Sequence, residues 1–206
     1  MILRSLGKPW QFVNLELLDS QDFMTLGFAS HSGQSIHQSK LKEMMQYFQI
    51  SEKLLKCPAS WPMDPKDKVN AVVDFDEPQP LFNACSGKHL AHLVKCQKEN
   101  WDMEHYPHPD HPLQKKFKEY LRKAAQVELI PLTDSCGLPT YAIPVQNFLN
   151  MCQKLVTTPN PYVENMLSLW QNHPRLMGGI NRFDSDISED LGKYFIAKEA
   201  ADGLML

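Results

Sequence analysis

Apolar residues recur along much of this chain at the spacing of a helix that buries one face. The clearest example follows Ser35, where apolar side chains stand at positions i, i+3, i+4 and i+7: Leu41, Met44, Met45 and Phe48. The same periodicity predicts helices that begin near Ser86, at Pro112, near Val145 and near Val163. Because each of these apolar faces has to be covered, the chain is predicted to fold as a helix-rich domain.

Two other apolar segments are predicted to be strands. Residues 22–34, "DFMTLGFASHSGQ", are an apolar run that leads into a Ser-Gly turn, which indicates a buried strand. The end of this strand would deliver Ser30, His31 and Ser32, and functional side chains commonly follow such ends. Residues 127–132, "VELIPL", predict a second buried strand that leads into the sharp turn "TDSCGLPT".

The composition limits the classes of protein that the chain can represent. A length of 206 residues, of which 43% are hydrophobic, suits one domain, and we predict that domain over residues 1–206. The net charge of -3 and the lack of a basic block argue against nucleic acid as a partner. No run approaches the roughly 18 apolar residues of a membrane span, and no signal-peptide pattern is present, so we expect a cytoplasmic protein without a membrane partner.

The stretch "NACSGKHLAHL", residues 83–93, gathers reactive residue types at a predicted helix start. Cys85 and Lys88 are three residues apart, so one helical turn places both side chains on one face. Cys96 returns to that face roughly 16 Å further along the axis and cannot join the same site. The chain has five cysteines, an odd number without close pairs, which is typical of reduced thiols. Spacing alone leaves a nucleophile, a metal site and a simple turn as interpretations of this stretch.

Serine and lysine residues offer a second kind of chemistry. A serine hydroxyl becomes a strong nucleophile when a base removes its proton, and a lysine can act as that base when its pKa is lowered. Ser5 and Lys8 have a spacing of one turn, although the bare pattern is common. The histidines of "HYPHPDHP", residues 105–112, recur at every third position, and we interpret this segment as a proline-rich loop before a helix rather than as a metal site.

Several motifs occur in an order that resembles one enzyme family. They are "RSLGKPWQ" at 4–11, "ASHSG" at 29–33, "NACSGKH" at 83–89, "PDHPLQ" at 109–114, "TDSCGLPTYAIP" at 133–144, "GGINRFD" at 178–184, "IAK" at 196–198 and "ADG" at 201–203. In sequence and order they resemble the class 3 L-asparaginases, also called the asparaginase II or Rhizobium-type family. The resemblance spans nearly the whole chain, and "CSGKH" together with "D-x-CG-x-P" is its most specific part.

The resemblance implies hydrolysis of the side-chain amide of L-asparagine to L-aspartate and ammonia. It also implies an α/β fold with an α-β-α arrangement, like that of the serine β-lactamase and glutaminase group, and a homodimer. Carried over position by position, it implies two serine-lysine tandems, Ser5 with Lys8 and Ser30 with Lys198. Which of the two serines would attack the substrate stays open at this point.

The resemblance further implies a zinc site beside the serines. The ion would be held by Cys85, Lys88 and Cys136, with a water as the fourth ligand. The charge of the ion disfavours the ammonium form of a coordinated lysine, so Lys88 would bind as a neutral amine. Cys85 would then be a ligand and not a nucleophile. Three further residues match positions that bind the substrate or support the metal: Arg4, His89 and Asp134.

Two departures from the family leave alternatives open. Family chains extend further at both ends, where they supply strands of the central sheet, so we expect an incomplete sheet with unpaired edges here. The family usually has glycine where Ser135 stands, and a positive φ at that position would strain the turn that holds Cys136. Three interpretations follow: an active asparaginase, a non-catalytic remnant that still binds zinc, and an amidohydrolase that acts on glutamine, since one methylene gives only about 1–3 kcal/mol of discrimination.

Overall fold

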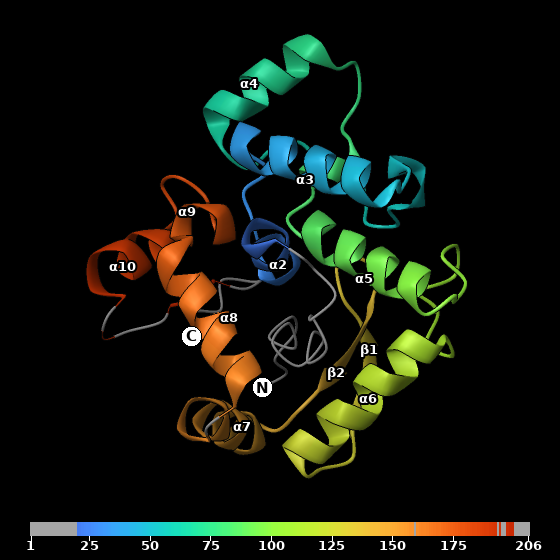
Figure 1. Cartoon of the computed structure of the whole chain (residues 1–206), viewed down its shortest axis with the longest axis vertical. Coiled ribbons are helices and arrows are strands. Elements are labelled where there is room, and N and C mark those ends of the chain that lie inside the picture. The colour runs from blue at the N-terminus through green and yellow to red at the C-terminus, as the bar shows by residue number, and fades with distance from the viewer. Residues whose placement is uncertain (1–19, 159, 193, 195–196, 200–206) are drawn as a thin grey trace.

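The computed structural model describes residues 20–158, 160–192, 194 and 197–199 (Figure 1). The predicted class, a helix-rich α/β chain, is confirmed. The longer helices of the described residues are α2 (Gln21–Phe28), α3 (Ser35–Phe48), α4 (Pro65–Asp74), α5 (Ser86–Lys98), α6 (Pro112–Ala125), α7 (Val145–Thr157), α8 (Pro161–Asn172) and α10 (Phe183–Leu191). The short helical turns are η1 (Glu52–Leu54), η2 (Pro80–Phe82) and α9 (Pro174–Met177), and the strands are β1 (Ile130–Thr133) and β2 (Pro139–Ala142).

Helix α2 lies among α3, α5, α8 and α9 and packs against each of them (Figure 1). Its side chains Phe23 and Leu26, three residues apart, are buried in the main core. Gly87 of α5 lets the two helices touch, because a Cβ atom there would lie 2.2 Å from the Leu26 carbonyl oxygen. The strand predicted in residues 22–34 is therefore wrong. A short apolar run fits a buried strand and a buried helix equally well, and packing on all sides selects the helix.

A second, smaller core lies between α6, α7 and the β1–β2 hairpin. The two strands pair antiparallel, with Ile130 opposite Ala142 and Thr133 opposite Pro139. Strand β1 is mostly exposed and β2 is buried, so the predicted strand near residues 127–132 exists, but the buried partner is the one that follows the turn. Within the described part of the chain, the sheet consists of these two strands.

The helix boundaries follow from local chemistry that the sequence makes visible. The helices predicted near Ser86, at Pro112, near Val145 and near Val163 are present as α5, α6, α7 and α8. His111 is the N-cap of α6 and its ring accepts the N–H of Leu113, while Pro112 takes the first helical position. None of the described helices is long and apolar enough to cross a membrane.

Candidate functional site

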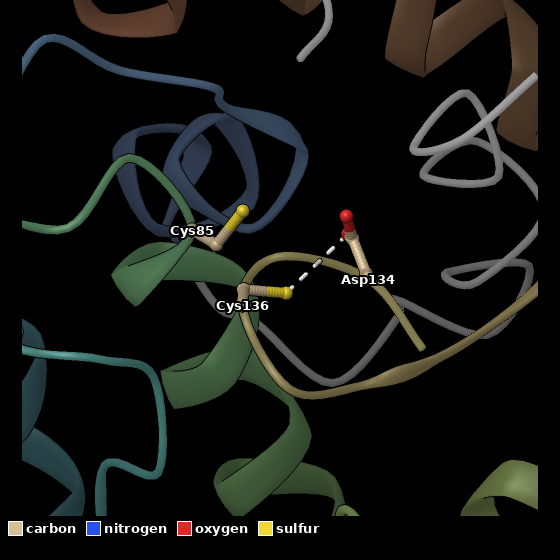
Figure 2. A group of neighbouring side chains, drawn as sticks. All are labelled: Cys85, Asp134 and Cys136. Atoms are coloured by element: carbon tan, nitrogen blue, oxygen red, sulfur yellow. Dashed lines mark hydrogen bonds between the residues drawn. The ribbon is translucent and has the colours of Figure 1, made fainter. Parts of the chain in front are cut away.

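The strongest candidate for a reactive site is a cluster of two cysteines and an aspartate (Figure 2). Cys85 directly precedes α5, and Asp134 and Cys136 lie in the turn between β1 and β2. The two Sγ atoms and one carboxylate oxygen lie within 4.8 Å of one another. Asp134 and Cys136 are buried and Cys85 is partly buried. Sulfur and oxygen donors at this spacing are suited to hold a metal ion.

Backbone hydrogen bonds fix the two segments that carry this cluster. The side-chain oxygen of Asn83 accepts the N–H of Cys85 at 2.9 Å, which sets that residue at the start of α5. Across the hairpin turn, the N–H of Asp134 donates to the carbonyl of Leu138 at 2.8 Å. The N–H of Gly137 donates back to the carbonyl of Asp134 at 2.9 Å, which closes the turn around Cys136.

The positive φ that would strain Ser135 is not found. Ser135 is not among the described residues with positive φ, whereas Gly137 has a φ of 87°. The left-handed conformation that this turn requires therefore falls on a glycine, which adopts it without steric cost. Serine at position 135 is compatible with the turn, and its N–H donates to Asp134 Oδ1 at 2.8 Å.

Lys88 reaches the same cluster from the first turn of α5. Its side chain is 1% exposed, and Nζ lies 3.4 Å from Asp134 Oδ2. It also hydrogen-bonds to Cys136, whose thiol donates to the same carboxylate oxygen at 3.4 Å. The three residues predicted as metal ligands, Cys85, Lys88 and Cys136, are thus brought together. Asp134, which was predicted to support the substrate or the metal, has a carboxylate oxygen within 4.8 Å of both cysteine Sγ atoms.

Burial and neighbouring charges shift the pKa values of Lys88 and Asp134 in opposite directions. Burial disfavours the ammonium form of Lys88, but the neighbouring Cys85, Cys136 and Asp134 outweigh it and the pKa of Lys88 is raised. Burial likewise opposes ionisation of Asp134, and the charge of Lys88 prevails, so the pKa of Asp134 is lowered. A hydrogen bond with Cys85, followed by burial, raises the pKa of the Cys136 thiol. These side chains by themselves therefore form an ion pair between Lys88 and Asp134 beside a protonated thiol.

His89, a predicted substrate-binding residue, is fully buried behind the cluster. Its Nδ1 atom lies 2.5 Å from the hydroxyl of Tyr106, and that hydroxyl oxygen also accepts the N–H of Lys56 at 3.1 Å. This face of the imidazole is therefore occupied by a buried tyrosine. The segment around Tyr106 is a loop before α6, which agrees with our interpretation of residues 105–112.

Ser30 and Lys198, the residues of one predicted tandem, are linked to neighbouring residues at the end of α9. The N–H of Ser30 donates to the carbonyl of Met177, the last residue of α9, at 3.2 Å. Lys198 is buried, and its Nζ lies 3.6 Å from Oδ2 of Asp184, which belongs to α10. A Cβ atom on Gly178 would lie 2.7 Å from Asp184 Oδ1, so the glycine leaves room for the carboxylate that pairs with Lys198. Ser30 thus contacts the end of α9 directly, and Lys198 is linked to the next residue, Gly178, through Asp184.

The remaining predicted residues, Arg4, Ser5 and Lys8, lie outside the described residues. Two further polar residues make buried contacts in this part of the molecule. His31, predicted with Ser30 and Ser32 at the end of the apolar run, has its Nε2 3.0 Å from Ser86 Oγ, and Asp184 pairs with Lys198. Asp184 was not predicted as a site residue, and its place in the motif "GGINRFD" was the signal that could have pointed to it.

The comparisons with known proteins add one finding. A family model described as L-asparaginase II matches residues 1–206. No curated protein matches the chain. The family match covers both the Cys85–Cys136 cluster and the segments of Ser30 and Lys198.

Proposed function

This chain belongs to the L-asparaginase II family, and we propose on that premise that it hydrolyses the side-chain amide of L-asparagine to L-aspartate and ammonia. The family match over residues 1–206 is the observation that carries the proposal. It makes the chain an amidohydrolase of the L-asparaginase type. The attacking group and the metal are finer points, which we propose from the residues.

We assign the attack on the amide to Ser30 and the movement of its proton to Lys198. The support for this pairing is that the N–H of Ser30 bonds Met177 at the end of α9, while Lys198 pairs with Asp184, for which the next residue, Gly178, leaves room. A serine needs a base to become a strong nucleophile, and a lysine withdrawn from water can serve as one. Ser5 with Lys8 is the second tandem of the proposal, and it rests on the resemblance alone.

The proposed reaction proceeds in two steps, each with a balanced proton transfer. Ser30 Oγ bonds to the amide carbon while its proton passes to Lys198 and on to the departing nitrogen, so that the C–N bond breaks and ammonia leaves. Water then attacks the resulting β-aspartyl ester, giving its proton through Lys198 to the serine oxygen. Backbone N–H groups near the attacked carbonyl stabilise the oxyanion of both steps.

The cluster of Cys85, Lys88, Asp134 and Cys136 fits a zinc ion by the chemistry of its donors. Zinc in proteins is held by sulfur, nitrogen and oxygen ligands, and the two sulfurs and a carboxylate oxygen already lie within 4.8 Å of one another. We propose that the two cysteines and Lys88 hold the ion, while Asp134 accepts an N–H of the Lys88 amine and so orients it. A bound zinc ion supplies positive charge that favours thiolates and a neutral amine and that polarises a nearby carbonyl.

Three further residues and two properties of the whole protein complete the proposal. Asp134, His89 and Arg4 are proposed to support the substrate, with His89 held in place by Tyr106. A homodimer and a cytoplasmic location stay predictions.

The proposed function is tested by ammonia release from L-asparagine, with L-glutamine as the competing substrate. Wild-type protein should release ammonia from L-asparagine, and Ser30→Ala should lower kcat by at least about 1,000-fold if Ser30 is the nucleophile. Ser39→Ala is the matched control, because Ser39 is exposed on α3 and, among the described residues, its hydroxyl bonds only the carbonyl of Ile36. No ammonia from either substrate would refute the activity. Full activity in Ser30→Ala would transfer the attack to Ser5.

A further inference from the structure

A buried carboxylate holds the segment that carries Lys198. Asp184 is the second residue of α10 and is 2% exposed. Its Oδ2 atom lies 3.6 Å from Lys198 Nζ and also accepts the N–H of Glu199 at 2.9 Å. One carboxylate oxygen thus contacts both the side chain of Lys198 and the backbone that follows it.

The neighbouring arginine adds a second attachment to the same segment. Arg182 Nη2 lies 2.5 Å from Glu199 Oε2, and Arg182 Nε lies 3.8 Å from Asp184 Oδ1. Asp184 Oδ1 has no hydrogen-bond partner among the described residues. Arg182 and Asp184 therefore face side chains of opposite charge, Glu199 and Lys198. A buried carboxylate in such a place is retained against a large desolvation cost, which calls for a specific reason.

The position of Asp184 relative to Ser30 gives that reason. Gly178 has space for no side chain, because a Cβ atom there would meet Asp184 Oδ1 at 2.7 Å. The carbonyl of Gly178 accepts the N–H of Ser32 at 2.8 Å, and the carbonyl of the preceding Met177 accepts the N–H of Ser30. Gly178, which leaves room for the Asp184 carboxylate, is thus joined through its own carbonyl and that of Met177 to the segment of Ser30 and Ser32.

We propose that Asp184 is a positioning residue for Lys198, which it holds beside the Ser30 segment. This inference rests on the proposed function, in which Lys198 exchanges protons with the attacking serine. Its geometric part stands independently, since the ion pair and the Glu199 hydrogen bond do not depend on the reaction.

Asp184→Asn is the informative variant. An asparagine keeps an oxygen that can accept the N–H of Glu199 and removes only the charge that faces Lys198. We expect kcat for L-asparagine to fall by about 10- to 100-fold, with KM changed much less, because a misplaced proton carrier impairs the chemical step more than binding. Asp186→Asn is the matched control on the same helix, where the carboxylate pairs with Arg175 near the surface, and it should keep wild-type kcat.

A double-mutant cycle separates positioning from a general structural effect. If Asp184 acts through Lys198, then Asp184→Asn should lower kcat no further once Lys198→Met is present. An equal loss in both backgrounds would overturn the proposal, and so would an unchanged kcat in Asp184→Asn alone. The thermal unfolding midpoint of each variant is measured alongside, so that a loss of fold is recognised.

A measurement that does not depend on enzyme activity tests this inference separately from the proposed function. Lysines are acetylated with a water-soluble active ester, and the rate at Lys198 is read by peptide mass spectrometry. Asp184→Asn should raise the rate at Lys198 several-fold, while the rate at buried Lys88 should stay unchanged as a check of the fold. An unchanged rate at Lys198 overturns the inference even if the wild-type protein is active. A protein that shows the rise but releases no ammonia keeps the positioning contact and refutes the proposed function.

Discussion

The two reactive regions of this molecule are assembled in different ways. The Cys85–Cys136 cluster joins two regular elements, the start of α5 and the β1–β2 hairpin, and each is closed by short-range backbone hydrogen bonds. The Ser30–Lys198 region joins the segment after α2, the loop after α9 and residues 197–199, which are held to one another by contacts between distant parts of the sequence.

This difference determines how each region should respond to amino-acid substitution. In the cluster, the backbone already places the donors, so the identity of each side chain decides what it can bind. In the Ser30–Lys198 region, the placement itself depends on buried polar contacts, so a change of charge or protonation alters the geometry. Substitutions should therefore affect ligand binding in the first region and stability or proton transfer in the second.

The largest expected effect is the loss of zinc from the cluster. Cys136→Ser should weaken zinc binding by at least about 100-fold, because a serine hydroxyl replaces a soft thiolate ligand. Zinc per chain is measured by elemental analysis after dialysis, together with the unfolding midpoint. Cys152→Ser is the control, since Cys152 packs in the second core between α6 and α7. One zinc ion retained in Cys136→Ser would remove this residue from the ligand set.

The second-largest expected effect is a loss of stability at acidic pH, caused by a buried histidine near Ser30. His37 stacks on His31 with ring centroids 4.8 Å apart, and burial, opposed by a hydrogen bond to the Arg175 carbonyl, lowers the pKa of His37 to about 4. The unfolded chain binds a proton at this histidine near pH 6.5 and the folded chain does not, so stability is complete above pH 6.5 and is lost as the pH falls toward 4.

This loss amounts to about 3 kcal/mol of unfolding free energy between pH 7 and pH 4. It is measured by urea unfolding at several pH values. His37→Gln keeps a donor for the Arg175 carbonyl and should make the pH dependence less steep, whereas His108→Gln, at an exposed position, is the control. Equal slopes in wild type and His37→Gln would show that this histidine does not couple the Ser30 region to pH.

The sequence carried more information about the first region than about the second. Cys85 and Lys88 share a helical face by spacing alone, and the turn that holds Cys136 was recognised from its Asp, Gly and Pro residues. That the two segments meet came from the resemblance, because periodicity does not specify which turn faces which helix. Asp134 was predicted to support either the substrate or the metal, because a carboxylate in a turn has no sequence signal that distinguishes a metal ligand from a substrate-binding group.

The misses in the second region have a physical cause as well. The apolar run of α2 was predicted as a strand, since a run of eight residues fits either element and the surrounding packing decides. The pairing of Asp184 with Lys198 and the stacking of His31 on His37 are tertiary contacts without a periodic pattern. The helices α5 to α8 were predicted well, because their apolar faces and caps are local properties.

A smaller effect is expected when the hairpin turn of the cluster is strained. Gly137→Ala puts a Cβ atom on a residue with φ of 87°, and the nearest atom to that Cβ would be the Lys56 carbonyl oxygen at 3.8 Å. The cost is therefore conformational and amounts to about 1–2 kcal/mol of unfolding free energy. Urea unfolding measures it, and zinc content should stay at the wild-type value. A turn that tolerates alanine without loss of stability would show that its backbone is less fixed than the hydrogen bonds indicate.

The smallest effect is expected for the exposed ion pairs of α10, in contrast to its buried carboxylate. Arg175 of α9 pairs with Asp186 at 2.6 Å and also with Glu189, and all three side chains are partly exposed to water. Solvent screens such pairs, so Arg175→Gln should cost less than about 1 kcal/mol, and the difference from wild type should shrink in 1 M salt. Urea unfolding at low and high salt gives both values. By contrast, Asp184, two residues before Asp186, is 2% exposed and forms its ion pair with Lys198. A loss in Arg175→Gln that is large and insensitive to salt would mean that the surface pairs, and not the buried carboxylate, hold α10 against the Ser30–Lys198 region.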